Sequence, residues 1–192
     1  MEEQLTGMEI LGQLGVILDG HFVYTSGRHG ANYVAKTNAL PDVMAVHELC
    51  GMLADKMRDC GIDVVVGPSM GAITLAHALA FELSTVGKSV KAVRVDKQDD
   101  GSFAFPYDWA ELVDDKKVAV AEDVLTTGKT TRLVVDCILN AGGMPVAVGA
   151  LWNRGGLSAE EVASPLLVST VNMQLDSFAA DECSLCADKV PV

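Results

Sequence analysis

The sequence predicts an α/β fold with a central parallel sheet flanked by helices. Four short valine-rich runs, at 63–67, 90–95, 117–123 and 145–153, have the length and composition of buried strands. Segments with helical spacing of apolar residues alternate with these runs, which favours parallel strands joined by right-handed crossovers. Polar residues and glycines follow three of the runs, and the carboxyl ends of parallel strands are where such sheets bind ligands.

The amino-terminal third predicts a smaller unit in front of this sheet. Residues 1–15 carry leucines and a methionine at roughly helical spacing, which predicts a helix. Residues 21–40 contain two β-rich runs around the polar loop 26–30, a pattern typical of two strands. A helix then extends from Pro41-Asp42 to about Arg58, because Gly61 supplies a stop signal.

The remaining elements follow in order along the chain. A glycine-containing turn after the first sheet strand leads into a helix over 72–83. Polar residues at 96–102, followed by the short run 103–105, predict a hairpin or a mobile excursion. The last predicted helix covers 129–143. No repeat or linker divides the 192 residues, so we expect one domain over 1–192.

Composition narrows the classes of partner. Twenty-six acidic residues against 14 basic ones give a net charge of -12, and no basic run exceeds two residues, so we expect no nucleic-acid partner. The most apolar span, 64–83, is broken by glycine, proline and histidine, which argues against a membrane helix. The first residues lack the features of a secretory signal, and five mostly scattered cysteines fit reduced thiols. We therefore expect a cytoplasmic protein.

The stretch "AEDVLTTGKTT" at 121–131 predicts a phosphate site. It is no Walker A loop, because Asp123 stands where that motif needs its first glycine. Residues 126–130 would nevertheless present several backbone N–H groups at the start of a helix, where anions are favoured. A threonine-rich helix cap with a solvated lysine is the alternative interpretation.

The two acids before this loop call for a different ligand group. Carboxylates repel phosphate, but Glu122 and Asp123 could accept hydrogen bonds from two adjacent sugar hydroxyls. A phosphorylated pentose would use both halves of the motif. The competing interpretation is a pair of acids exposed at the end of a strand.

Two hydrophobes, two acids and a Thr-Thr-Gly turn into a helix resemble the signature through which type I phosphoribosyltransferases bind 5-phosphoribosyl 1-pyrophosphate (PRPP). "VAVAEDVLTTGKT" follows this pattern and departs from it chiefly at Lys129, where glycine is usual. "GHFVYTSGRHGANYV", "VVVGPSMGAITLAHALA" and "LWNRGG" look like successive segments of orotate phosphoribosyltransferases. The tail "DECSLCADKVPV" resembles the ending of one prokaryotic branch, so the likeness covers nearly the whole chain.

The resemblance implies a type I phosphoribosyltransferase fold, with a small hood built from about residues 1–40 and the C-terminal segment. It implies transfer of the phosphoribosyl group from PRPP to orotate, giving orotidine 5'-monophosphate and pyrophosphate. Mg2+ would arrive with PRPP rather than on protein side chains. The family also implies a homodimer, because its mobile loop serves the partner's site.

Carried over residue by residue, the resemblance assigns three groups of site residues. The expected PRPP-binding residues are Glu122, Asp123, Val124, Leu125, Thr126, Thr127, Gly128, Lys129, Thr130, Ser69, Arg94 and Lys97. The expected orotate-binding residues are Thr126, Arg154, Ser26 and Arg28. The expected catalytic residues are Lys97, Asp123 and Glu122.

Alternatives stay open at several of these positions. The loop 67–71 could be a plain strand-to-helix turn, and Arg154 could be a structural residue at the sheet edge. The segment that corresponds to the family's mobile loop, at 94–105, is poor in basic residues for this family. A purine phosphoribosyltransferase or a non-catalytic PRPP-sensing protein therefore also fits. Cys183 and Cys186 form a CxxC pair, for which we favour a structural or incidental role, since two ligands cannot close a tetrahedral zinc site. A metal shared across a subunit interface is the alternative.

Overall fold

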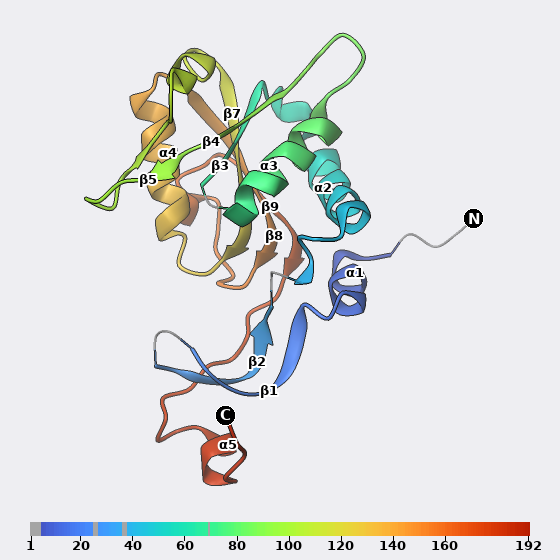
Figure 1. Ribbon diagram of the computed structural model, residues 1–192, viewed down its shortest axis with the longest axis vertical. Coiled ribbons are helices and arrows are strands. Elements are labelled where there is room, and N and C mark those ends of the chain that lie inside the picture. The colour runs from blue at the N-terminus through green and yellow to red at the C-terminus, as the bar shows by residue number, and fades with distance from the viewer. Residues whose placement is uncertain (1–4, 25–26, 36–37, 69) are drawn as a thin grey trace.

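A computed structural model of the chain describes all residues except 1–4, 25–26, 36–37 and 69. Its centre is a five-stranded parallel sheet in the order β4-β3-β7-β8-β9 (Figure 1). The strands are β3 (Val64–Gly67), β4 (Lys91–Arg94), β7 (Lys117–Leu125), β8 (Met144–Asn153) and β9 (Leu167–Asn172). The four predicted strands are thus confirmed, and β9 is an edge strand that the sequence analysis missed.

Helices cover both faces of the sheet, as predicted (Figure 1). They are α1 (Gly7–Gln13), α2 (Val43–Met57), α3 (Met70–Leu83) and α4 (Lys129–Asn140). Valines alternate along the strands, so that Val65 packs with α2 and α3 whereas Val64 and Val66 pack with α4. Short 3-10 helices in the described part of the chain include Arg58–Cys60, Trp109–Leu112 and Glu160–Val162.

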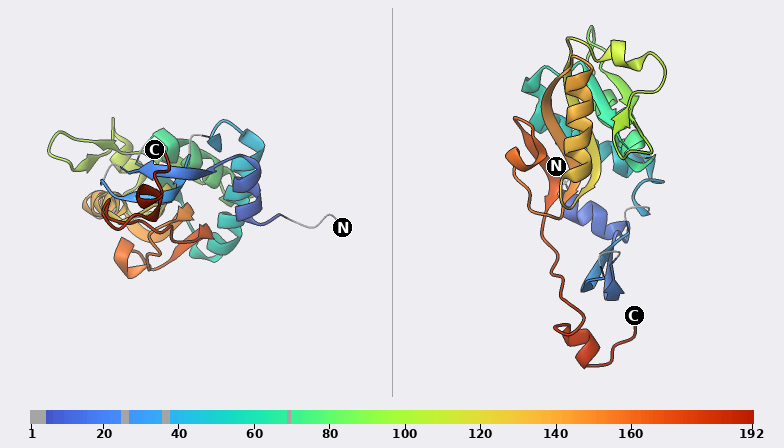
Figure 2. Two further views of the ribbon diagram at one scale, coloured as in Figure 1. Left: turned by 90° about the horizontal axis from the view of Figure 1, so that it is seen from below. Right: turned by 90° about the vertical axis from the view of Figure 1, so that its left-hand side faces the viewer.

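A hairpin and the C-terminal segment lie beyond the carboxyl ends of the sheet strands (Figures 1 and 2). The hairpin pairs β1 (Ile17–Val23) with β2 (His29–Val34) in antiparallel fashion, as the sequence predicted. The backbone of His29 exchanges two hydrogen bonds with that of Phe178, at 2.9 and 2.8 Å, which joins the hairpin to the tail. The tail ends in the short helix α5 (Ser184–Ala187). We refer to residues 17–34 and 176–192 together as the hood.

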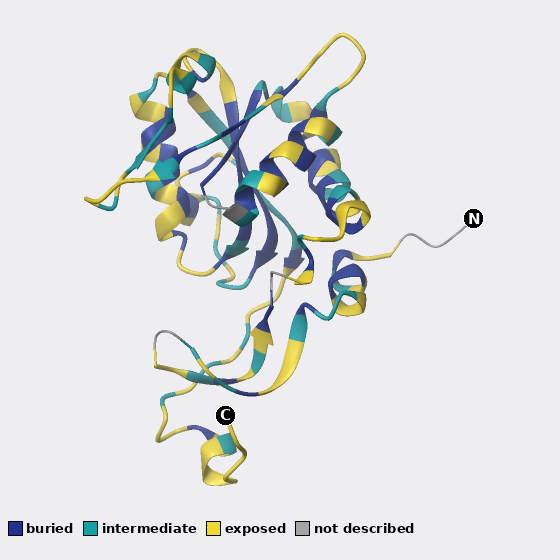
Figure 3. Cartoon of the chain, in the orientation of Figure 1, coloured by how far each residue is buried: buried dark blue, intermediate teal, exposed yellow. Residues whose placement is uncertain are grey.

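The sheet with its helices is much more buried than the hood (Figure 3). The core lies between the sheet and its helices, whereas most of the hood is exposed. The expected excursion after β4 is a small hairpin of β5 (Asp96–Lys97) and β6 (Phe103–Ala104). Among the described residues, no helix has the length and apolar character needed to cross a membrane. The single-domain organisation and the cytoplasmic location stay predictions.

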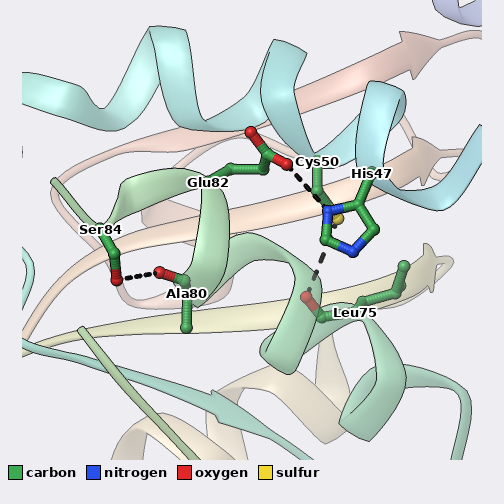
Figure 4. A network of polar contacts seen from close by, with 6 residues as sticks. All are labelled: His47, Cys50, Leu75, Ala80, Glu82 and Ser84. Atoms are coloured by element: carbon green, nitrogen blue, oxygen red, sulfur yellow. Dashed lines mark hydrogen bonds and ion pairs between the residues drawn. The ribbon is translucent and has the colours of Figure 1, made fainter. Parts of the chain in front are cut away.

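Polar contacts join α2 and α3 around a buried thiol (Figure 4). The Cys50 thiol of α2 donates to the carbonyl oxygen of Leu75 in α3 at 3.8 Å. Nearby, His47 Nδ1 lies 2.8 Å from a carboxylate oxygen of Glu82, again joining the two helices. The Ser84 hydroxyl donates to the carbonyl of Ala80 at 2.7 Å and closes the end of α3.

Burial of Cys50, together with the charge of Glu82, raises the pKa of its thiol to about 12. Because the thiolate is the reactive form, we expect Cys50 of the folded protein to resist iodoacetamide near the ordinary thiol pKa of about 8.5. The half-buried Cys60 should react under the same conditions, and both should react in denaturant. Peptide mass spectrometry measures this, and equal labelling of Cys50 and Cys60 in the folded protein would contradict it.

Candidate active site

The two acids of the motif are buried inside β7. Glu122 and Asp123 are 7% and 4% exposed, so the interpretation as acids exposed at a strand end is wrong. The strand also continues past them to Leu125 rather than ending at Asp123. Asp123 Oδ1 accepts a hydrogen bond from the backbone N–H of Val124 at 2.7 Å, and Glu122 Oε1 accepts from that of Asp123 at 3.2 Å. Buried carboxylates are costly, which makes a functional role the better explanation.

Neighbours in a strand point to opposite faces, so the two carboxylates leave β7 on different sides. Asp123 lies toward the start of α3, where a Cβ added to Gly71 would lie 2.6 Å from Asp123 Oδ2. Glycine at position 71 is therefore what allows this carboxylate to approach the turn after β3. Both acids line the same cavity, but their joint contact with one diol stays a prediction.

The loop after β7 leaves the start of α4 open for an anion. Gly128 is the N-cap of α4, with a φ of 69°, and no side chain caps this end. The Thr127 hydroxyl accepts a long hydrogen bond of 3.5 Å from the N–H of Lys129, so the threonine cap of the alternative interpretation is present only in a weak form. A cavity of about 240 Å³ lies here, lined by residues 122–131. Unused N–H groups at a helix start attract phosphate.

Thr131 was missed by the sequence analysis. Its side chain is 1% exposed, it lines this cavity, and its hydroxyl has no hydrogen-bond partner among the residues that the structure describes. Buried hydroxyl groups normally have a partner, so this one is a further candidate ligand contact. The sequence offers only one weak signal, a second threonine directly after Thr130.

A second cavity of about 430 Å³ adjoins the first through Thr126 and Thr127, which line both. Its other lining residues are Tyr24, Arg154, Gly155, Leu175 and Ser177. The guanidinium carbon of Arg154 lies 4.5 Å from the centre of the Tyr24 ring, a cation–π contact that orients Arg154. An arginine and an aromatic ring beside a phosphate-sized cavity suit a flat, anionic group.

Side-chain and backbone hydrogen bonds on either side of Arg154 hold the segment after β8 in place. The Asn153 side chain donates to the carbonyl of Leu157 at 2.8 Å and accepts from its N–H at 2.9 Å. The N–H of Gly155 donates to the carbonyl of Leu125 at 3.0 Å. A Cβ at Gly155 would lie 1.9 Å from the carbonyl oxygen of Thr126, so only glycine fits there. Two loops that are distant in sequence are thereby held together around the second cavity.

The other predicted site residues do not lie together. Val124 and Leu125 line the first cavity, although their side chains pack in the core. Arg28 lies in the hood, where its Nε donates to the Ser177 hydroxyl at 2.9 Å. Ser26 and Ser69 lie outside the described residues.

The residues expected from the mobile loop stand apart from both cavities. Arg94 Nε donates to Asp96 Oδ1 at 2.9 Å, and this hydrogen bond raises the pKa of the guanidinium. Lys97 is exposed in β5. Neither residue is among those that line the two cavities. In this conformation the sheet and the hood form the site without the β5–β6 hairpin.

A cavity at a helix start, two buried acids beside it and an arginine-bearing second cavity define a sugar-phosphate transferase site on this α/β fold. Residues 37–185 match the phosphoribosyl transferase domain, and the chain belongs to that family.

Relatives of known name agree with this assignment. The chain is 30% identical over 185 residues to the orotate phosphoribosyltransferase of Caldicellulosiruptor bescii, covering 96% of this chain and 93% of that protein. It is 35% identical over 182 residues to the orotate phosphoribosyltransferase of Carboxydothermus hydrogenoformans, covering 92% and 88%. The resemblance drawn from the sequence is confirmed.

Solved structures confirm the predicted fold class. The orotate phosphoribosyltransferase of Mycobacterium tuberculosis in complex with PRPP matches this structure with a TM-score of 0.68. The identity is 22%, and the match covers 87% of this chain and 96% of that one.

Gly128→Ala tests the conformation of the phosphate loop. A Cβ at this left-handed position would lie 3.0 Å from Leu157 Cδ1, so we expect the free energy of unfolding to fall by about 1–3 kcal/mol. The thermal stabilisation that PRPP gives the wild type should also shrink. Denaturant unfolding and ligand-dependent melting measure the two effects.

Gly12→Ala is the matched control, because Gly12 is a helical glycine with no atom within 4 Å of an added Cβ. We expect it to stabilise the protein by about 0.5–1 kcal/mol and to leave the response to PRPP unchanged. If Gly128→Ala behaved like this control, the loop would not need its left-handed glycine.

Proposed function

We propose that this protein transfers the phosphoribosyl group from PRPP to orotate, giving orotidine 5'-monophosphate and pyrophosphate for pyrimidine synthesis. The observation that carries the proposal is the pair of adjoining cavities at Thr126 and Thr127, one at the start of α4 and one beside Arg154. Relatives that are about 30% identical over nearly the whole chain bear the name of this activity, which supports the choice of base.

The first cavity would hold the ribose phosphate. The N–H groups at the start of α4 would bind the 5-phosphate, aided by the hydroxyls of Thr127 and Thr130. Glu122 and Asp123 would accept hydrogen bonds from the ribose hydroxyls. As the bond to pyrophosphate breaks, positive charge develops on the sugar, and two buried carboxylates stabilise that charge.

The second cavity would hold the base. Orotate is flat and carries a carboxylate, and a guanidinium held against an aromatic ring offers two parallel N–H donors to such a group. Arg154 has this arrangement on Tyr24. Thr126 would contact the base from the phosphate loop, and Ser26 and Arg28 would cover it from the hood.

Magnesium would accompany PRPP. The carboxylates and hydroxyls around the first cavity are hard oxygen donors of the kind that Mg2+ prefers, so these residues are compatible with a metal–substrate complex. When bound, Mg2+ would neutralise negative charge on the departing pyrophosphate. The turn at 67–71, including Ser69, would contribute donors to the same group.

We further propose a homodimer in which Lys97 and Arg94 of one copy serve the site of the other. An apolar groove of about 910 Å³ lies between α2 and α3. Three large apolar side chains are well exposed along it: Val43 at 65%, Met44 at 79% and Phe81 at 69%. A second copy of this chain would bury that surface, and it would bring a β5–β6 hairpin to a site that lacks its own.

Arg154→Ala tests the assignment of the base. We expect the KM for orotate to rise about 30-fold or more, because a charge-assisted bidentate contact contributes about 2–3 kcal/mol. The KM for PRPP should change less than about twofold, since the phosphate lies in the other cavity. The loss of orotate absorbance in the presence of Mg2+ and PRPP measures both constants.

Arg58→Ala is the control, because Arg58 pairs with Asp55 on the exposed surface of the α2 end and touches neither cavity. Wild-type protein that consumed adenine or hypoxanthine instead of orotate would indicate a purine phosphoribosyltransferase. PRPP binding with no transfer to any base would indicate a sensing protein.

Mixing two inactive variants tests the shared site. Lys97→Ala changes the β5–β6 hairpin, and Asp123→Asn changes the proposed sugar site. Each variant alone should lose most of its activity. If Lys97 acts across the dimer, reassorted subunits contain intact sites, and the mixture should recover about a quarter of wild-type activity. Steady-state rates after co-refolding measure the recovery.

Phe81→Glu provides the companion experiment, because it places a charge on the exposed apolar groove. We expect this change to convert the dimer to a monomer in sedimentation and to abolish the recovery. A mixture that stays inactive while the variants still form mixed dimers would contradict the shared site.

A further inference from the structure

The hood brings together four potential metal ligands that lie far apart in the sequence. His21 of β1, His29 at the start of β2, and Cys183 and Cys186 at α5 each offer one ligand atom, and these atoms all lie within 4.8 Å of one another. By themselves, Cys183 and Cys186 are two ligands and could not close a tetrahedral zinc site. The structure supplies the two missing ligands from the same chain.

The separations between the ligand atoms approach those of a tetrahedral site. His21 Nε2 lies 3.6 Å from the sulfur of Cys183 and 3.6 Å from that of Cys186. The sulfur of Cys186 lies 3.3 Å from His29 Nδ1. Zinc bonds of about 2.0–2.3 Å in tetrahedral geometry place ligand atoms roughly 3.3–3.8 Å apart. The two imidazole nitrogens, at 2.9 Å, would have to move apart slightly, and any pair near the 4.8 Å upper limit of the cluster would have to close.

A backbone contact orients one imidazole for metal binding. His21 Nδ1 lies 2.7 Å from the carbonyl oxygen of Val190, and a carbonyl can only accept, so this nitrogen donates its hydrogen. The neutral ring then carries its lone pair on Nε2, which faces the two sulfurs. This is the outer hydrogen bond that metal-binding histidines usually make.

The tail around these ligands has almost no apolar core of its own. Cys183 is 4% exposed and His21 5% exposed, whereas most described residues from 176 to 192 are exposed or half-buried (Figure 3). Small units of this kind are commonly held by a metal ion or a disulfide.

We propose that His21, His29, Cys183 and Cys186 bind one structural Zn2+ ion that fastens the C-terminal segment to the β1–β2 hairpin. Two thiolates and two imidazoles in tetrahedral arrangement favour zinc over Mg2+ or Ca2+, which prefer oxygen ligands. Binding releases one proton from each thiol, and the resulting centre is electrically neutral. All four positions are filled by protein, so the ion has no open position for catalysis.

The position of the centre gives it a role in arranging the hood. His29 directly follows Arg28, whose Nε donates to the Ser177 hydroxyl at 2.9 Å. Ser177 lines the second cavity, and the backbone of the adjacent Phe178 pairs with that of His29. The zinc ion therefore holds both sides of the hood beside the cavity while lying outside it. This inference is independent of which base the enzyme accepts.

The test is the zinc content and the cobalt spectrum of the full-length protein, purified under reducing conditions. We expect about one zinc per chain by mass spectrometry of the metal. Cobalt(II) in its place should give the intense visible bands of a tetrahedral ion and a near-ultraviolet sulfur-to-cobalt band. Cys183→Ser with Cys186→Ser should lose at least about nine-tenths of the bound metal and both spectral features.

Cys60→Ser is the matched control, because Cys60 is a free thiol outside the cluster. It should keep the metal and the cobalt spectrum. The proposal is overturned if reduced wild-type protein supplied with zinc binds none, if the double variant retains it, or if cobalt shows the weak bands of an octahedral ion. Wild-type metal content and spectrum decide the matter even if the double variant is poorly folded.

Discussion

The contact between the Gly155 backbone and the carbonyl of Thr126 is the constraint on which the site depends. A Cβ at Gly155 would lie 1.9 Å from that carbonyl oxygen, and the Gly155 N–H donates to Leu125 at 3.0 Å. The loops after β7 and β8 can therefore touch only because no side chain stands between them. Their contact puts Arg154 next to Thr126 and makes two adjoining cavities out of two separate loops.

At the same edge of the sheet, a short length of chain carries groups of opposite charge, the N–H groups of a helix start and two carboxylates. The start of α4 offers positive N–H groups without a capping side chain, and two carboxylates lie buried just before it in β7. Anionic phosphate and the cationic sugar of a transition state need opposite surroundings. A strand that turns directly into a helix provides both, since its acids lie in the sheet and its amides point out of the helix.

Local features were predictable from sequence, whereas pairings across the chain were not. The residues from Glu122 to Thr130 are contiguous, so one motif predicted the order of strand, loop and helix here, although it ended the strand two residues before Leu125. The strand β9 was missed because it lies at the sheet edge and is mostly half-buried, which leaves no continuous apolar run. Tyr24 gave no signal, because its role depends on its packing against Arg154, which is distant in sequence.

The four potential metal ligands of the hood show the same limit, and the zinc site proposed there suggests a role for the tail. Cys183 follows His21 by 162 residues, so their approach depends on the whole fold and cannot be read from the spacing of either pair. The hood has little buried surface, yet it lines, through Tyr24 and Ser177, a cavity whose other walls are mostly the loops after β7 and β8. A metal ion can fix such a segment without enlarging its core, because four ligands replace many apolar contacts. The proposed zinc ion would thereby keep Ser177 beside the second cavity without changing the loop after β7.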